Sequence, residues 1–466
     1  MISRVMGLVR EQTFAFFFGA GVWTDAFNVA FRIPNLLRDL FAEGAMSSAF
    51  VPIFNATFHK QGKDAGFRLT NITLTMLGVI VGVITILGII LSPFIVSILA
   101  PGFVATFGKF ELTVLMTRIM FPFLLAISWA AIAMGVLNSL NEFFIPAIAP
   151  VFLNGAMIIA GFSFCPFIES MGYPSIVGMA MGAMLGGILQ MAVQFFSLWK
   201  KDFRLKAIWD LKDENLRKIF ILILPGTIGL AATQINIAVS TILATSQGDG
   251  AVSWLGYAFR IMQLPLGIFG VSIAQATLPV FSRHAAASNR EEMANSISDS
   301  IKLTGFMAIF ASFSILALAE PIIRIVFEHG KFNEADTFAT SIALQSYAVG
   351  LTFFSLVKLI GPAFYALGDT KTPIFASIAS VIANLALNLL LIGPFGYWGL
   401  ALGSSLAAVV NSGILYYRLR KRLGNLTKHH LLFSLGKICL AALFSAGTMK
   451  FMNHFLPGKL ACFLNL

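Results

Sequence analysis

The chain has 466 residues, of which 58% are hydrophobic and only 11% are charged, and its formal net charge at pH 7 is +11. A soluble domain carries about 25% charged residues, so this composition excludes an ordinary soluble fold. Apolar runs of about 20 residues also exclude a transmembrane β-barrel, because its strands alternate polar and apolar residues.

Thirteen segments are apolar and long enough to cross a bilayer as helices, which takes roughly 17–25 residues. The second and eighth are unusually long and contain Pro34 and Pro265, where we expect kinks. The sequence therefore predicts an all-α polytopic membrane protein with about 13 transmembrane helices. In chain order the predicted spans are residues 2–20, 25–57, 68–98, 111–138, 145–166, 174–199, 216–245, 250–281, 298–327, 337–366, 372–393, 397–418 and 431–456.

Positive charge is divided unevenly among the loops between these spans. Eighteen Lys and Arg residues lie in loops after even-numbered helices, whereas loops after odd-numbered helices up to the eleventh hold only Lys109 and Lys331. Short loops rich in Lys and Arg stay in the cytoplasm. The pattern predicts a cytoplasmic N-terminus, and it accounts for the net charge without a nucleic-acid partner.

The chain contains an internal repeat at a shift of 227–228 residues: Ala30–Ile33 returns as Ala258–Ile261, and Pro146 returns as Pro373. Each copy holds six helices, so both enter the membrane from the same side and form parallel repeats, with a substrate site between two lobes near the midplane. We expect an N-terminal six-helix lobe at 1–200, a basic cytoplasmic connector at 201–215, a C-terminal six-helix lobe at 216–422 and an additional C-terminal helix at 423–466.

Ionisable side chains gather in the first two predicted helices. In the first, Arg4 and Glu11 share one face at a spacing of seven, with Arg10 about 120° away. Such groups cost about 2.5–3.5 kcal/mol each at membrane depth, so they mark ion pairs or a watery cavity. The second helix holds five of them within nineteen residues, namely Asp25, Arg32, Arg38, Asp39 and Glu43.

Two interpretations of these charges stay open. In the first, the acids and bases pair with each other and stabilise a bend, an interpretation that suits Arg32, Asp39 and Glu43. Alternatively, the surplus of arginines binds an anion, and phosphate or pyrophosphate matches the guanidinium fork. The corresponding helix of the second copy keeps Arg260 and has Ser253 in place of Asp25, so the charge is concentrated in one lobe.

The sequence gives little indication of catalysis, metal binding or a phosphate-binding loop. The sequence shows no hydrolase or metal motif, and its six histidines lie in loops or near helix ends. Three scattered cysteines predict neither a disulfide framework nor a metal site. Gly178, Gly182 and Gly186 predict close helix packing rather than a phosphate loop. We expect no cofactor and no metal.

Several motifs resemble those of the MurJ/MviN lipid II flippases, which belong to the multidrug/oligosaccharidyl-lipid/polysaccharide exporter superfamily. In the N-terminal part they are SRVMGLVRE at Ser3–Glu11, TDAF at Thr24–Phe27, PNLLR at Pro34–Arg38 and FAEGA at Phe41–Ala45. In the second half, QLPLG at Gln263–Gly267 is similar to the family's eighth helix. The resemblance covers essentially the whole chain.

The resemblance implies a transporter, not an enzyme, in the bacterial cytoplasmic (inner) membrane. Such a protein flips the lipid-linked peptidoglycan precursor lipid II, an undecaprenyl-diphosphate-linked disaccharide-pentapeptide, from the inner to the outer leaflet by alternating access. Cell-wall biosynthesis and cell shape depend on this step, and membrane lipids and the cell-wall synthesis machinery are the implied partners. The implied substrate-binding and transport residues are Arg4, Arg10, Asp25, Arg38 and Arg260, with Asn35, Glu43, Ser253 and Lys358 as secondary candidates.

The chain departs from the family pattern at both ends. We expect it to begin inside the family's first helix and to hold thirteen helices where fourteen are usual, which removes part of the groove for the lipid tail. Three alternatives remain: a flippase for another polyprenyl-diphosphate-linked oligosaccharide, a drug/cation antiporter, and a membrane-embedded glycosyltransferase. The antiporter needs unpaired acids in its cavity, and the glycosyltransferase needs acidic metal-binding loops.

Overall fold

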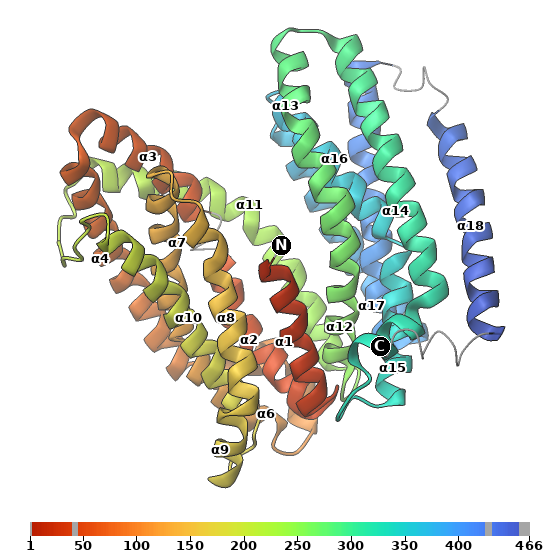
Figure 1. Ribbon diagram of the computed structural model, residues 1–466, viewed down its shortest axis with the longest axis horizontal. Helices are drawn as coiled ribbons and strands as arrows, with labels where there is room; N and C mark the ends of the chain where they lie inside the picture. The colour runs from red at the N-terminus through yellow and green to blue at the C-terminus, as the bar shows by residue number, and fades with distance from the viewer. Residues whose placement is uncertain (1, 40–44, 425–430, 456–466) are drawn as a thin grey trace. The chain divides into compact units, whose positions relative to one another are not determined.

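The computed structural model describes residues 2–39, 45–424 and 431–455, and all regular structure in these ranges is helical (Figure 1). This confirms the predicted fold class. The helices are α1 (Ile2–Phe18), α2 (Val22–Arg38), α3 (Ala45–Gln61), α4 (Lys63–Ile90), α5 (Ser92–Leu99), η2 (Pro101–Ala105), α6 (Lys109–Met120), α7 (Phe123–Ser139), α8 (Phe144–Phe162), α9 (Phe164–Ser170), α10 (Val177–Trp199), α11 (Glu214–Thr245), α12 (Ala251–Pro265), the π-helical η3 (Leu266–Val271), α13 (Ser272–Ala286), α14 (Arg290–Phe327), α15 (Glu334–Ala348), α16 (Leu351–Ala366), α17 (Lys371–Leu423) and α18 (Leu431–Phe455).

Within the described ranges, seven helices are long and apolar enough to cross a membrane, or eight if α15 and α16, bent by 44°, form one span. Each of the thirteen predicted spans overlaps helix, but several are divided. Helix α17 covers two predicted spans. Between them, at Gly396, its backbone leaves helical geometry with φ 58° and ψ −142°. Only glycine adopts that conformation readily, so this residue permits the reversal between the two spans.

The helices form two compact units, Met1–Val252 and Ser253–Leu466. Helix α11 packs against α3 and therefore groups with the first unit, although it follows the predicted connector. The predicted limits at 1–200, 201–215, 216–422 and 423–466 follow the sequence repeat rather than compactness, and they stay a prediction.

The repeat is visible in the places where helices divide. The second helix of the second copy changes from α12 to the π-helical η3 directly after Pro265 and continues as α13, whereas the corresponding junction between α2 and α3 lies outside the described residues. The fourth helix of each copy is also split, between α6 and α7 and between α15 and α16. At the second of these breaks Gly350 lets the chain approach α17, because a Cβ there would lie 2.6 Å from the Cα of Ser405. Helix α2 continues through Pro34 to Arg38.

Small residues bring α8, α9 and α10 together in the first unit. A Cβ on Gly178 would lie 2.7 Å from the backbone nitrogen of Cys165, and one on Gly186 would lie 2.9 Å from the Cα of Leu153. Distances this short exclude any larger residue without backbone movement. The prediction that these glycines serve helix packing is confirmed.

Candidate functional site

A buried ion pair joins α2 to α6 in the first unit. Asp25 and Lys109 have side chains that are 0% and 1% exposed, and Lys109 Nζ lies 2.9 Å from Asp25 Oδ2. Lys109 Nζ also lies 2.7 Å from Asp249 Oδ1 and 4.1 Å from the ring centroid of Phe103. The backbone amide of Gly250 donates to Asp25 Oδ2 at 2.7 Å. We call these four groups, Asp25, Lys109, Asp249 and the Gly250 amide, the Lys109 network.

Local sequence explains how the Lys109 network assembles. Asp25 lies in the first turn of α2, where the helix dipole favours a negative charge. Gly108 takes a left-handed conformation with φ 73° immediately before α6 and so turns the chain into Lys109. Gly102 has no side chain where a Cβ would collide with the carbonyl group of Thr245, so η2 packs closely on the end of α11. The loop that carries Asp249 is thereby held beside Lys109.

The sequence predicted Asp25 but not Lys109 as a site residue. The available signal was that Lys109 is one of two cations in the loops after odd-numbered helices. Asp25, Lys109 and Asp249 lie in or beside the loops after the first, third and seventh predicted helices, which share one parity. The Lys109 network therefore lies at the end of the bundle that the charge pattern predicts to be extracytoplasmic.

Arg10 is held inside the first unit by a neutral and an acidic partner. Its side chain is 11% exposed and forms an ion pair with Glu11, the adjacent residue. Its Nη1 donates to Asn154 Oδ1 on α8 at 3.2 Å, and Asn154 in turn donates to the carbonyl of Ser3 at 3.4 Å. Arg4 lies nearly two turns earlier on α1 and is exposed. The two arginines thus belong to one helix but differ in accessibility.

The C-terminal half of α2 faces α11. Arg32 Nη1 donates to Thr241 Oγ1 at 3.0 Å, and Gln234 Nε2 donates to Asp39 Oδ2 at 3.2 Å. Arg38 pairs with Asp39, with 2.9 Å between Nη2 and Oδ1, while its side chain stays 23% exposed. The internal pairing that the sequence suggested for Asp39 is therefore present, with Arg38 as a partner.

One secondary candidate, Asn35, lies near the same end of α2. The buried Oδ1 of Asn35 accepts no hydrogen bond from the residues that the structure describes. An unsatisfied buried amide oxygen costs free energy, and a donor from a ligand would remove that cost. Glu43 lies outside the described residues.

The remaining candidates belong to the second unit. Ser253 is fully buried near the start of α12, whereas Arg260 is exposed on the same helix before Pro265. Lys358 is exposed on α16. Their approach to Arg10 and Arg38 stays a prediction.

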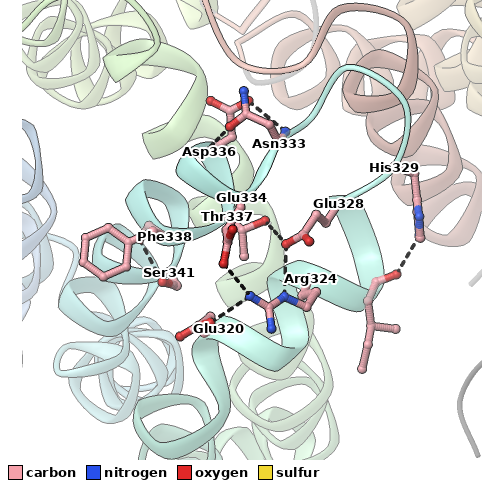
Figure 2. A network of polar contacts seen from close by, with 11 residues as sticks. Glu320, Arg324, Glu328, His329, Asn333, Glu334, Asp336, Thr337, Phe338 and Ser341 are labelled. Carbon is pink, nitrogen blue, oxygen red and sulfur yellow. Dashed lines mark hydrogen bonds and ion pairs between the residues drawn. The ribbon is translucent and has the colours of Figure 1, made fainter. Parts of the chain in front are cut away.

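A polar network at the α14–α15 turn contains the acidic residues Glu320, Glu328, Glu334 and Asp336 (Figure 2). Arg324 contacts Glu320 and Glu328 at 3.1 Å, and Thr337 donates to Glu328 at 2.6 Å. Asn333 and Asp336 form a capping box that begins α15. Because Trp254 Nε1 also donates to Asp336 at 3.0 Å, the network fixes the start of α12 against α15. In the described part of the chain, no group of three or more His, Cys, Asp or Glu side chains is placed to hold a metal ion.

Comparison with known proteins places these features in a family. The family profile described as "Lipid II flippase MurJ" matches residues 14–465. A protein of Vibrio cholerae serotype O1 named "Probable lipid II flippase MurJ" is 36% identical over 424 residues, which span 89% of this chain and 80% of that protein. "Lipid II flippase MurJ" of Burkholderia cenocepacia is 35% identical over 426 residues, 91% of this chain and 82% of that protein.

Solved structures agree with the sequence comparisons. "Lipid II flippase MurJ, inward closed conformation" superposes with a TM-score of 0.80 at 27% identity and covers 96% of this chain and 90% of that chain. An inward-facing multidrug resistance MATE family transporter of the MOP superfamily has a TM-score of 0.72 at 16% identity, over 91% of this chain and 99% of that one. The second likeness concerns the fold alone.

Proposed function

The chain belongs to the family of the lipid II flippase MurJ, and on this premise we propose that it moves lipid II from the inner to the outer leaflet of the bacterial cytoplasmic membrane. The substrate combines a polyprenyl tail that stays in lipid with a diphosphate and a polar sugar-peptide head group. No bond is formed or broken in this transport. The protein's task is to lower the free energy of an anionic head group inside the bilayer.

The observation that supports this role most directly is the state of Arg10. Its guanidinium lies within α1 with a side chain only 11% exposed, and it is held by Glu11 and by the neutral Asn154. A buried cation is stable only with partners, and a diphosphate is a stronger bidentate partner than an amide oxygen. Arg10 can therefore exchange Asn154 for substrate without leaving its charge unpaired.

We propose that Arg4, Arg10, Arg38 and Arg260 bind the head group, and Asn35, Glu43, Ser253 and Lys358 stay secondary candidates. Arg38 is 23% exposed and already carries a carboxylate partner in Asp39, which an incoming diphosphate would displace. Asp25 acts as a positioning residue, since its carboxylate binds Lys109 rather than presenting a free charge to an anion.

Alternating access requires an outer gate, and the Lys109 network has the geometry of one. It ties α2 and α6 to the loop between α11 and α12, which follows the first helix of the predicted C-terminal lobe. With the N-terminus in the cytoplasm, the network closes the extracytoplasmic end while the head group enters from inside. The membrane potential then favours export of the anion by about 2.3 kcal/mol per charge per 100 mV.

The test uses proteoliposomes with labelled lipid II and a reagent that reads the outer leaflet. Arg38→Ala and Arg260→Ala should insert normally and lose transport. Arg290→Ala is the matched control, because Arg290 is an exposed cation at the start of α14. Normal transport by both Arg38→Ala and Arg260→Ala would refute the site assignment.

The same liposomes also test the substrate. If the protein served another polyprenyl-diphosphate-linked oligosaccharide, that lipid would move faster than lipid II. In cells, depletion of the protein should leave lipid II on the inner leaflet, and an unchanged leaflet distribution would contradict the proposed function.

A further inference from the structure

An apolar groove with a cation at its mouth lies on the first unit, distant in sequence from the substrate candidates. It has a volume of about 340 Å³, within the usual range of roughly 300–1,000 Å³ for ligand pockets. Its walls come from α7, α10 and the connector, and none of these elements carries a candidate substrate residue. The groove is lined by Trp129, Met191, Phe195, Trp199, Phe203, Arg204 and Leu205, and we call it the Arg204 groove.

The connector side of the groove is held in a defined position along α4, where it forms the irregular yellow-green trace in Figure 1. Asn71 of α4 donates to the carbonyl of Arg204 and accepts from the amide of Lys206, each at 3.0 Å. Phe203 is 2% exposed and packs edge-on against Phe67 with 5.3 Å between ring centroids. The groove is thus a formed feature of the unit, not a loose loop resting on helices.

Among the described residues, Arg204 and Lys200 have aromatic or carbonyl partners, and the only acid that interacts with Arg204 is Asp202, which lies beyond ion-pair distance and is paired with Lys63. Arg204 donates to the carbonyls of Trp199 and Phe203 at 2.9 and 3.1 Å, and its guanidinium lies 5.4 Å from the Trp199 ring. Lys200 Nζ lies 4.6 Å from the ring centroid of Phe196. No carboxylate of the described residues lies within ion-pair distance of Lys200, Arg204 or Lys206, whereas nearby Lys201 pairs with Glu142 at 2.5 Å.

We propose that the Arg204 groove binds an anionic membrane phospholipid, with an acyl chain against Trp129, Met191 and Phe195 and the phosphate on Arg204. Lys200 and Lys206 add positive charge beside it. Basic pockets at the cytoplasmic ends of transmembrane helices recognise such head groups by this combination of charge and apolar wall. Trp199 and Leu205 are 55% and 52% exposed, as expected for side chains at the level of the lipid head groups. The predicted orientation places them in the inner leaflet.

The experiment measures lipid binding to the full-length protein in detergent by native mass spectrometry, with phosphatidylglycerol and phosphatidylcholine as probes. The wild type should prefer phosphatidylglycerol. Each cation removed should reduce that preference about fivefold, so Arg204→Ala with Lys200→Ala should lose about 25-fold. Lys212→Ala is the matched control, since this connector lysine does not line the groove.

Two further variants separate binding from folding. Arg204→Lys keeps the charge and should retain most of the preference, while Met191→Trp fills the groove and should weaken both lipids without changing charge. Unchanged binding in Met191→Trp, or an equal loss in Lys212→Ala, would overturn the proposal. Displacement of phosphatidylglycerol by undecaprenyl diphosphate at equal concentration would also overturn it, because the occupant would then be a substrate lipid. Lipid II transport is measured in parallel, so loss of lipid preference with normal transport leaves the proposed function intact.

Discussion

Replacing Lys109 with methionine should open the first unit at the end that the charge pattern predicts to be extracytoplasmic. The change removes the ammonium and keeps a side chain of similar length against Phe103. Asp25, which is 0% exposed, then loses the cation 2.9 Å away and retains the amide of Gly250. Removing one partner of a buried ion pair costs about 3–5 kcal/mol, because the other charge is left uncompensated.

Even the lower value, about 3 kcal/mol, predicts a large shift from the closed to the open conformation. If only the closed state contains the Lys109 network, a loss of about 3 kcal/mol lowers the ratio of closed to open molecules about 150-fold. Asp249→Asn should do far less, because the Asp249 side chain is 44% exposed and such pairs contribute about 1 kcal/mol or less. Lys109→Met combined with Asp25→Asn removes both buried charges and should restore much of the closed state.

Spin labels at Phe107 and Ser246, both exposed beside the Lys109 network, measure the opening as a distance distribution in nanodiscs. The Lys109→Met protein should show a longer distance and slower lipid II transport. The gate is refuted if this variant keeps the wild-type distribution, or if Asp249→Asn opens the protein as much.

Two further predictions concern packing and pH. Gly350→Ala should lower the free energy of unfolding by about 1–3 kcal/mol, because its Cβ would meet the backbone of Ser405. In the control Gly413→Ala, the Cβ meets no atom within 4 Å, so stability should be unchanged or higher. Equal thermal unfolding temperatures of the two variants would contradict the packing argument. The backbone amide of Thr372 donates to Asp369 and holds the pKa of that carboxyl below its ordinary 3.8. The resulting stabilisation is present above about pH 4 and is lost as the pH falls through the lower pKa that Asp369 has in the folded protein. Asp369→Asn should therefore remove this part of the pH dependence of stability. An identical profile of stability against pH in the variant would contradict the prediction.

The fold was predictable because its signals are local. Apolar runs fix the helices, and the repeat placed Ala30–Ile33 and Ala258–Ile261 on corresponding elements, which are α2 and α12 in the structure. The points at which a single predicted span divides into two helices were harder to predict from the sequence. The break at Gly350 depends on close contact with Ser405, 55 positions later in the chain, and no local pattern carries that information.

The site was only partly predictable, because the partners of its charges are distant in sequence. Asp25 lies 84 positions from Lys109, and Arg32 lies 209 positions from Thr241. The sequence identified the charged residues by their presence in apolar helices, but it did not identify these partners. The helical wheel placed Glu11 on the face of Arg4 and about 120° from Arg10, and it did not predict the ion pair that Glu11 forms with Arg10.

The partners found in the first unit bear on how binding couples to movement. Arg10 and Arg38 each already contact a carboxylate, from Glu11 and Asp39. If these arginines bind the diphosphate as proposed, it must compete with those carboxylates. Asp39 in turn accepts from Gln234 on α11, the helix whose far end leads to Asp249. Displacing Asp39 from Arg38 therefore changes a carboxylate that touches α11, and the Lys109 network holds the other end of that helix. In the proposed mechanism, substrate binding and outer closure therefore act on one element, which is the physical requirement for the one to bias the other.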